Sequence, residues 1–224
     1  MTSCYEAVLF DMDGVIIDTE NSVTAFWQKI AQTYQVELTP ADFQQHIYGC
    51  PAIHTFDMLF PQLSADERQK IMADMETYEI NLTYTAVRGV VSFLTILKQH
   101  AIPTAIVTSG DRWKVQTVCQ QLGIEGMFSV QVTVNDIRRG KPYPDCYLLA
   151  AEKLEKSPEH CLVFEDAVSG VKAAIATGAS CIGIGKPEKA SALRQAGAST
   201  VIPDFLALPS LQFHKNKNLT LPLF

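Results

Sequence analysis

The chain has 224 residues, with 18 lysines and arginines against 24 aspartates and glutamates, which gives a formal net charge of −6 at pH 7. Hydrophobic residues make up 47% and charged residues 19% of the chain, an ordinary globular composition that excludes an intrinsically disordered protein. An acidic chain without a basic stripe cannot neutralise a phosphate backbone, so nucleic acid is not expected as a partner. No stretch reaches the roughly 20 apolar residues of a membrane span, so no membrane association is expected either.

The N-terminal segment MTSCYEAVLFDMDG lacks the basic residues and the uninterrupted apolar run of a secretory signal peptide. The six cysteines are far apart in the sequence and form no CxxC pair. We therefore expect a cytoplasmic protein whose cysteines are reduced and buried. The cysteines are Cys4, Cys50, Cys119, Cys146, Cys161 and Cys181.

Short apolar segments bounded by turn residues recur along the chain, with helical patterns between them. The segments are brief and do not alternate apolar with polar residues, which is typical of buried parallel strands. Strands that alternate with helices predict an α/β fold, a doubly wound parallel sheet with helices on both faces. The predicted strands are residues 7–10, 105–107, 130–134, 162–164, 181–184 and 200–202.

Residues 19–86 interrupt this alternation, because no strand pattern follows the first strand for roughly ninety residues. Instead, an apolar stripe at helical spacing begins at Val23, and Ser64 with Glu67 fits a capping box at the start of another helix. We therefore predict a helical domain at 19–86, inserted into an α/β domain formed by 1–18 and 87–224. The C-terminal segment HKNKNLTLPLF is expected to be a loosely held tail. The stripe comprises Val23, Phe26, Trp27, Ile30, Ala31 and Tyr34.

The segment FDMDG places two carboxylates, Asp11 and Asp13, directly after the first buried strand. Ligands of parallel sheets bind outside the carboxyl ends of the strands, so a site is expected here. A solvated turn is the alternative, because Asp and Gly are common turn residues. A calcium-binding loop is excluded, since Ile16 and Ser22 stand where that loop needs its Gly and its Glu.

The adjacent acids Glu165 and Asp166 end another predicted strand, and such a pair can supply hard oxygen ligands to Mg²⁺. Asp166 could instead cap the following helix. Thr108, Ser109 and Gly110 follow the strand at 105–107, where a hydroxyl and free backbone N–H groups can hold phosphate oxygens. Ser and Gly are also ordinary turn residues, which leaves that alternative open.

A fourth candidate is Lys141 in the segment RRGKPYPD, where neighbouring prolines could hold a lysine as a fixed positive charge. The alternative is a surface loop. Neither Gly-Lys pair of the chain has the upstream glycine of a nucleotide-binding P-loop, and no GxSxG segment of a serine hydrolase occurs.

In this order, from Asp11 to about Pro203, the motifs resemble the haloacid dehalogenase superfamily of Mg²⁺-dependent phosphotransferases. FDMDGVIIDT, GKPYPD and FEDAVSGVKAA are similar to the subgroup that contains β-phosphoglucomutase and sugar-phosphate phosphatases. The resemblance implies a Rossmann-like core, and it identifies the helical insertion with the cap domain of that subgroup. A dehalogenase fits this sequence less well than a phosphotransferase, because dehalogenases of the superfamily lack the second aspartate, here Asp13.

The resemblance also implies a role for each site residue. Asp11 would form an aspartyl-phosphate, and Asp13 would be the general acid and base, with its backbone carbonyl on Mg²⁺. Lys141 would hold the transferring phosphoryl group. The expected metal ligands are Asp11, Asp13, Glu165 and Asp166, and the expected phosphate-binding residues are Thr108, Ser109, Gly110 and Lys141.

Two departures from β-phosphoglucomutases bear on the reaction. Val23 stands where those enzymes carry a histidine that supports the acid/base, and the cap segment 49–52 reads GCPA, without their phosphate-gripping arginine. We therefore expect a Mg²⁺-dependent phosphatase that acts on a small phosphorylated metabolite, a sugar or sugar-acid phosphate. A phosphohexomutase is the first alternative, and an inactive binding protein of the same fold is the second. A monomer or weak dimer is the expected assembly.

Overall fold

The structure is a computed structural model, and it describes residues 3–209, 211–214 and 218–221. It divides into two compact units. The core unit comprises Met1–Asp18 and Thr85–Phe224, and the helical unit comprises Thr19–Tyr84.

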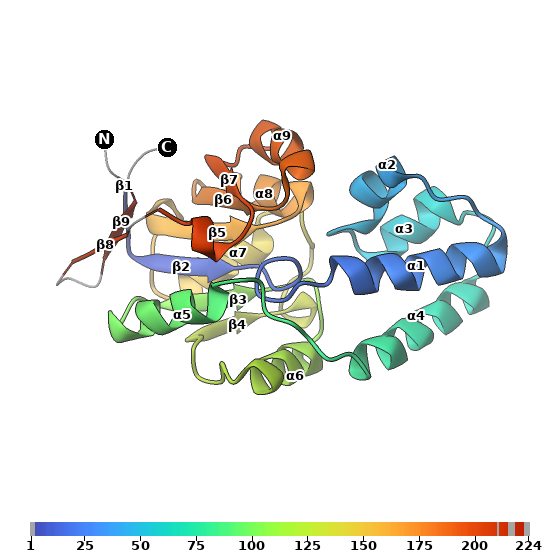
Figure 1. Ribbon diagram of the computed structural model, residues 1–224, viewed down its shortest axis with the longest axis horizontal. Helices are drawn as coiled ribbons and strands as arrows, with labels where there is room; N and C mark the ends of the chain where they lie inside the picture. Colours follow the sequence, from blue (N-terminus) through green and yellow to red (C-terminus); the bar gives the residue numbers. More distant parts are fainter. Residues whose placement is uncertain (1–2, 210, 215–217, 222–224) are drawn as a thin grey trace. The chain divides into compact units, whose positions relative to one another are not determined.

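A six-stranded parallel sheet in the order β4-β3-β2-β5-β6-β7 forms the centre of the core unit (Figure 1). All six predicted strands are present, and their ends differ from the prediction by at most two residues. The chain starts in the middle of the sheet, adds strands toward one edge, then returns to add strands toward the other. Because right-handed crossovers in opposite directions place helices on opposite faces, this order confirms the doubly wound α/β fold. The strands are β2 (Ala7–Phe10), β3 (Thr104–Val107), β4 (Val130–Val132), β5 (Cys161–Glu165), β6 (Ser180–Ile184) and β7 (Thr200–Ile202).

The predicted strand at 130–134 ends early for a local reason. Asp136 Oδ2 accepts hydrogen bonds from the backbone N–H and the hydroxyl of Thr133, both at 2.8 Å. This capping box starts a short 3₁₀ turn, η2 (Val134–Asp136), in place of more strand.

Helices cover both faces of the sheet. Successive strand residues point to opposite faces, so each strand contributes side chains to two separate hydrophobic layers. On one face, Leu9 and Val163 belong to a buried cluster with Tyr147 and Val171. On the other face, the Phe10 ring stacks on Phe164 at 5.4 Å between centroids. Among the helices that the structure describes, none is long and apolar enough to cross a membrane. The core-unit helices are α5 (Val90–Gln99), α6 (Arg112–Leu122), α7 (Asp145–Lys153), α8 (Val168–Ile175) and α9 (Pro187–Gln195), with short 3₁₀ turns η3 (Pro158–His160) and η4 (Phe205–Ala207).

The predicted loose tail is wrong for the part of it that the structure describes. The strands β1 (Ser3–Tyr5), β9 (Leu219–Leu221) and β8 (Gln212–Phe213) form a second, antiparallel sheet in the order β1-β9-β8 (Figure 1). The Leu219 side chain is fully buried. Pairing with the N-terminal strand, a contact between the two ends of the chain, holds the segment. Residues 215–217 and 222–224 of the predicted tail lie outside the described residues.

The helical unit contains α1 (Glu20–Tyr34), α2 (Pro40–Asp42), the π-helical turn η1 (Phe43–Ile47), α3 (Ala52–Leu59) and α4 (Ala65–Ile80). The predicted apolar stripe lies on α1, and Trp27 packs against the rings of Phe56 and Phe60. The predicted capping box is confirmed at the start of α4. The Ser64 Oγ accepts from the Glu67 N–H, and Glu67 Oε2 accepts from the Ser64 N–H at 2.9 Å.

All six cysteines are free thiols, as expected, but they are not all buried. Cys4 is exposed and Cys50 is half-buried, whereas the other four lie in the core unit's interior. Cys4 lies in the middle of the short strand β1 rather than in the main sheet, which explains its exposure.

Candidate active site

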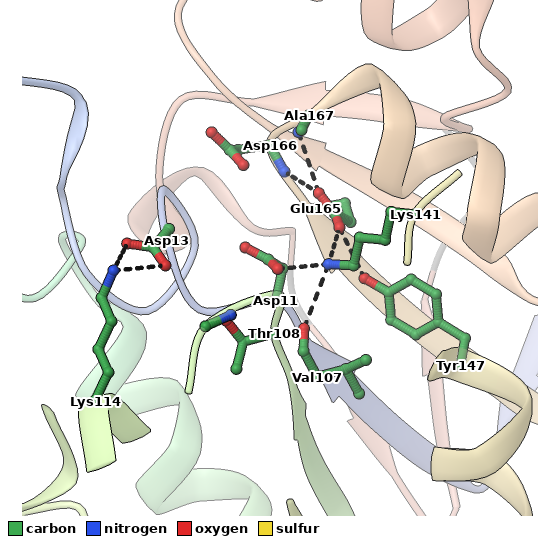
Figure 2. Close-up of polar contacts among 11 residues, drawn as sticks. Asp11, Asp13, Val107, Thr108, Lys114, Lys141, Tyr147, Glu165, Asp166 and Ala167 are labelled. Atoms are coloured by element: carbon green, nitrogen blue, oxygen red, sulfur yellow. Dashed lines mark hydrogen bonds and ion pairs between the residues drawn. The ribbon is translucent and has the colours of Figure 1, made fainter. Parts of the chain in front are cut away.

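The predicted site residues meet at the carboxyl end of the parallel sheet (Figure 2). Asp11 follows β2, Thr108 follows β3, and Glu165 is the last residue of β5. Because β2 pairs with both β3 and β5, the ends of these three strands are adjacent. The strand order also reverses here, which is where open α/β sheets bind their ligands.

Lys141 lies at the centre of this group. Its Nζ donates to Asp11 Oδ1 and to Glu165 Oε1, both at 2.5 Å, and to the Val107 carbonyl at 3.3 Å. The side chain is only 5% exposed, so the surface-loop alternative for Lys141 is wrong. Burial by itself lowers the pKa of Lys141, but the carboxylates of Asp11 and Glu165 raise it well above its ordinary value. The lysine is therefore a permanent positive charge at this site.

Glu165 is the residue that holds Lys141. Its Oε1 accepts from Lys141 and from the Tyr147 hydroxyl, the latter at 2.9 Å. Its Oε2 accepts from the backbone N–H groups of Asp166 and Ala167, at 3.0 and 3.1 Å. A carboxylate offers about four acceptor positions, and Glu165 uses four. Gly170 of α8 lies so close that a Cβ there would collide with this carboxylate.

Asp11 is buried and Asp166 is half-buried, and the pKa of each carboxyl group is raised. Burial raises the pKa of Asp11 well above its usual value, and the charges of Glu165 and Asp166 raise it further, while Lys141 opposes the shift. Burial likewise raises the pKa of Asp166 to about 7, against the opposing charge of Lys189, whose Nζ lies 3.5 Å from Asp166 Oδ2.

This acidic set fits a hard divalent cation. Asp11, Glu165 and Asp166 offer oxygen atoms that all lie within 4.8 Å of one another. The charges of these crowded carboxylates repel one another, and a cation of the Mg²⁺ type, which prefers oxygen ligands, relieves that repulsion.

Asp13 lies in the turn beyond Asp11, and both oxygens of its carboxylate are held. The Nζ of Lys114, on α6, donates to Asp13 Oδ1 at 3.0 Å and Oδ2 at 3.2 Å (Figure 2). The turn depends on Gly14, whose φ of +77° is left-handed and at which a Cβ would collide with the Asp166 carboxylate. The glycine therefore lets the turn approach Asp166.

The predicted phosphate-binding segment is a tight turn after β3. Thr108 is buried, its backbone N–H donates to the Val132 carbonyl, and its Oγ1 accepts from the Gly110 N–H at 2.9 Å. A hydroxyl that accepts a hydrogen bond can still donate one. Ser109 is exposed beside it. Figure 2 shows Thr108 with the Asp11–Lys141 group.

A family model for the haloacid dehalogenase-like hydrolases matches residues 8–184, most of the chain. The chain belongs to this family. Hexitol phosphatase A of Escherichia coli is 33% identical over 181 residues, which are 80% of this chain and 82% of that protein. The phosphorylated carbohydrates phosphatase of Thermotoga maritima is 32% identical over 177 residues, 77% of this chain and 82% of that protein.

A solved structure of β-phosphoglucomutase from Clostridium difficile shares the fold, with a TM-score of 0.76 at 22% identity over 92% of this chain and 93% of that one. The predicted resemblance to the haloacid dehalogenase superfamily, in its β-phosphoglucomutase-like and sugar-phosphate phosphatase subgroup, is confirmed. Family membership and the names of the relatives together support an enzyme of the phosphoric monoester hydrolase class.

Three residues that contact this hydrolase site were not predicted from the sequence: Lys114, Tyr147 and Lys189. Tyr147 lies on α7 and Lys189 on α9. In the sequence, Tyr147 resembles an ordinary core residue and Lys189 an ordinary surface residue. The sequence does contain one indication for Lys114. A lysine in the first turn of a helix lies at the positive end of the helix dipole, which indicates an acidic partner elsewhere in the fold.

Proposed function

We propose that this hydrolase is a Mg²⁺-dependent phosphatase that cleaves a small phosphate monoester, a sugar or sugar-acid phosphate, through a phosphorylated Asp11. The observation that carries the proposal is the contact of Asp11 with the buried ammonium group of Lys141 at the carboxyl ends of the strands. A carboxylate that attacks a phosphate dianion needs a positive charge beside it, because like charges must come together.

In the first half of the reaction, an oxygen of Asp11 attacks phosphorus and the bond between phosphorus and the leaving oxygen breaks. Lys141 holds Asp11 Oδ1, so the carboxylate is oriented and Oδ2 is the attacking oxygen. The same ammonium offsets the charge on the phosphoryl oxygens, which the Thr108 hydroxyl and Ser109 also hold, with Gly110 shaping the turn. Asp13 gives a proton to the leaving alkoxide.

In the second half, a water oxygen attacks phosphorus while Asp13 accepts the water proton. The bond between phosphorus and Asp11 breaks, its electron pair returns to the Asp11 carboxylate, and inorganic phosphate is released. Each bond formed is matched by one broken, and the enzyme returns to its starting state.

We assign the metal to Asp11, Asp166 and the backbone carbonyl of Asp13. Glu165, predicted as a further ligand, already accepts four hydrogen bonds, so we assign it to holding Lys141 instead. When bound, Mg²⁺ would supply positive charge that neutralises these carboxylates and the phosphate dianion.

A phosphate-release assay over a panel of phosphorylated sugars, sugar acids and polyols tests the proposal. We expect release with Mg²⁺, loss of release with EDTA, and recovery when Mg²⁺ but not Ca²⁺ is returned. Asp11→Asn, purified in parallel, controls for contaminating phosphatases. A panel with no turnover, or full turnover in EDTA, would contradict the proposal.

The phosphohexomutase alternative is tested with β-glucose 1-phosphate. A mutase must hold the phosphate groups at both ends of a bisphosphate intermediate, and segment 49–52 carries no cationic side chain to hold the second one. We expect any product to be inorganic phosphate rather than glucose 6-phosphate. Glucose 6-phosphate that forms faster than phosphate, in a coupled dehydrogenase assay with a bisphosphate activator, would establish the mutase instead.

A further inference from the structure

A buried lysine outside the predicted site contacts the proposed acid/base residue. Lys114 is the third residue of α6, and its side chain is 6% exposed. Its Nζ reaches across 101 positions of sequence to both carboxylate oxygens of Asp13, at 3.0 and 3.2 Å. Asp13 itself has a side chain that is 35% exposed, so it has room to rotate into solvent unless something holds it.

The aliphatic stem of Lys114 packs near Gly110 and Met12. A Cβ on Gly110 would lie 3.4 Å from the lysine Cδ and 3.4 Å from the Met12 methyl carbon, so Gly110 packs close to both side chains. Gly110 and Met12 therefore lie beside the stem of the lysine.

The position is unfavourable for a lysine that lacks a partner. The N-terminal end of a helix carries partial positive charge, which disfavours a cation there, and α6 has no acidic residue in its first turn, only Asp111 at its N-cap. Ordering a long side chain also loses rotamer entropy. The two hydrogen bonds to Asp13 offset these terms, so the lysine and the aspartate hold each other.

We propose that Lys114 is a positioning residue that holds the Asp13 carboxylate for the water-attack half of the reaction; this rests on the phosphatase function proposed above. In that half Asp13 must accept a proton from water at a fixed place beside phosphorylated Asp11. A carboxylate held through both oxygens has a fixed plane, whereas a free Asp13 would spend part of its time in solvent. Misplacement of a catalytic group by about 1 Å can slow a step 100-fold.

The test separates the two halves of the reaction with p-nitrophenyl phosphate, whose leaving group departs without help from an acid. In Lys114→Met the first half should continue while water attack slows. Stopped-flow measurement with Mg²⁺ should then show a burst of about one p-nitrophenolate per enzyme, followed by a steady rate about 10- to 100-fold below wild type. Lys114→Arg, which keeps a cation, should recover part of the steady rate.

Lys156→Met is the matched control, because Lys156 makes an ion pair of the same length, 3.0 Å, with Glu6 away from the site. It should show neither a burst nor a slower steady rate. If Lys114→Met does not fold, Lys114→Gln is measured in its place. An unchanged steady rate, or equal slowing of both halves without a burst, would overturn the inference while leaving the phosphatase function intact. A wild-type enzyme that hydrolyses no monoester would overturn both.

Discussion

Substitution of Gly170 by alanine tests how closely the fold is built around Glu165. Gly170 lies inside helix α8, where replacing glycine by alanine ordinarily stabilises a protein by about 1 kcal/mol. Here the added Cβ would overlap the Glu165 carboxylate, which is held by Lys141, Tyr147 and two backbone N–H groups. We therefore expect the sign of the effect to be reversed.

The change in the free energy of unfolding is the sum of a packing loss and a hydrogen-bond loss, minus the gain in helix propensity. Overpacking a rigid interior lowers stability by about 1–3 kcal/mol. If Glu165 moves aside, at least one hydrogen bond to a charged group is lost, worth about 1.5–3 kcal/mol. After subtraction of the helix-propensity gain of about 1 kcal/mol, the free energy of unfolding should fall by about 1.5–5 kcal/mol. For a chain of this size that lowers the melting temperature by at least about 3 °C.

Thermal unfolding followed by circular dichroism measures the change in stability. Because Glu165 holds Lys141, the rate of phosphate release measures whether Lys141 has been displaced. Gly140→Ala is the control, because Gly140 precedes Lys141, is exposed, and has nothing within 4 Å of an added Cβ. Its stability should stay within about 0.5 kcal/mol of wild type. A Gly170→Ala protein that is as stable as wild type, or more so, would refute the packing argument.

Three further predictions concern the same site. Asp11→Asn removes the attacking anion, so turnover in a steady-state assay should fall by at least about 10³-fold, while a melting curve should show that the fold is retained. A near-normal rate would place the nucleophile elsewhere. Burial raises the pKa of Asp166 to about 7, and Mg²⁺ binds the deprotonated form, so affinity should rise with pH up to about 7 and then level off. Calorimetric titration at pH 6 should give about tenfold weaker Mg²⁺ binding than at pH 8, and equal affinities would contradict the assignment. Tyr147→Phe removes a buried hydrogen bond of 2.9 Å to Glu165, so stability should drop by about 1.5–3 kcal/mol, and an unchanged melting temperature would show that the bond contributes nothing.

Much of the core unit could be predicted from the sequence because its signals are local. Each buried strand is a short apolar run, and the acids and hydroxyls that carry the chemistry directly follow such runs, as Asp11 follows β2 and Thr108 follows β3. In a parallel sheet the carboxyl ends of the strands lie on one edge, and this is where the sequence predicts a site. The capping box of Ser64 and Glu67 spans four residues and is readable for the same reason.

Only the tertiary structure decided what surrounds these residues. Lys141 contacts Asp11 across 130 positions of sequence, and Lys114 contacts Asp13 across 101. The pairing of β1 with β9 joins the two ends of the chain. No local pattern encodes such contacts, because they depend on which strands pair, in which register, and on which helix lies behind them. Gly14 and Gly170 illustrate the same limit. In the sequence they resemble an ordinary turn residue and an ordinary helix residue, and only the structure shows that a side chain there would collide with the carboxylates of Asp166 and Glu165.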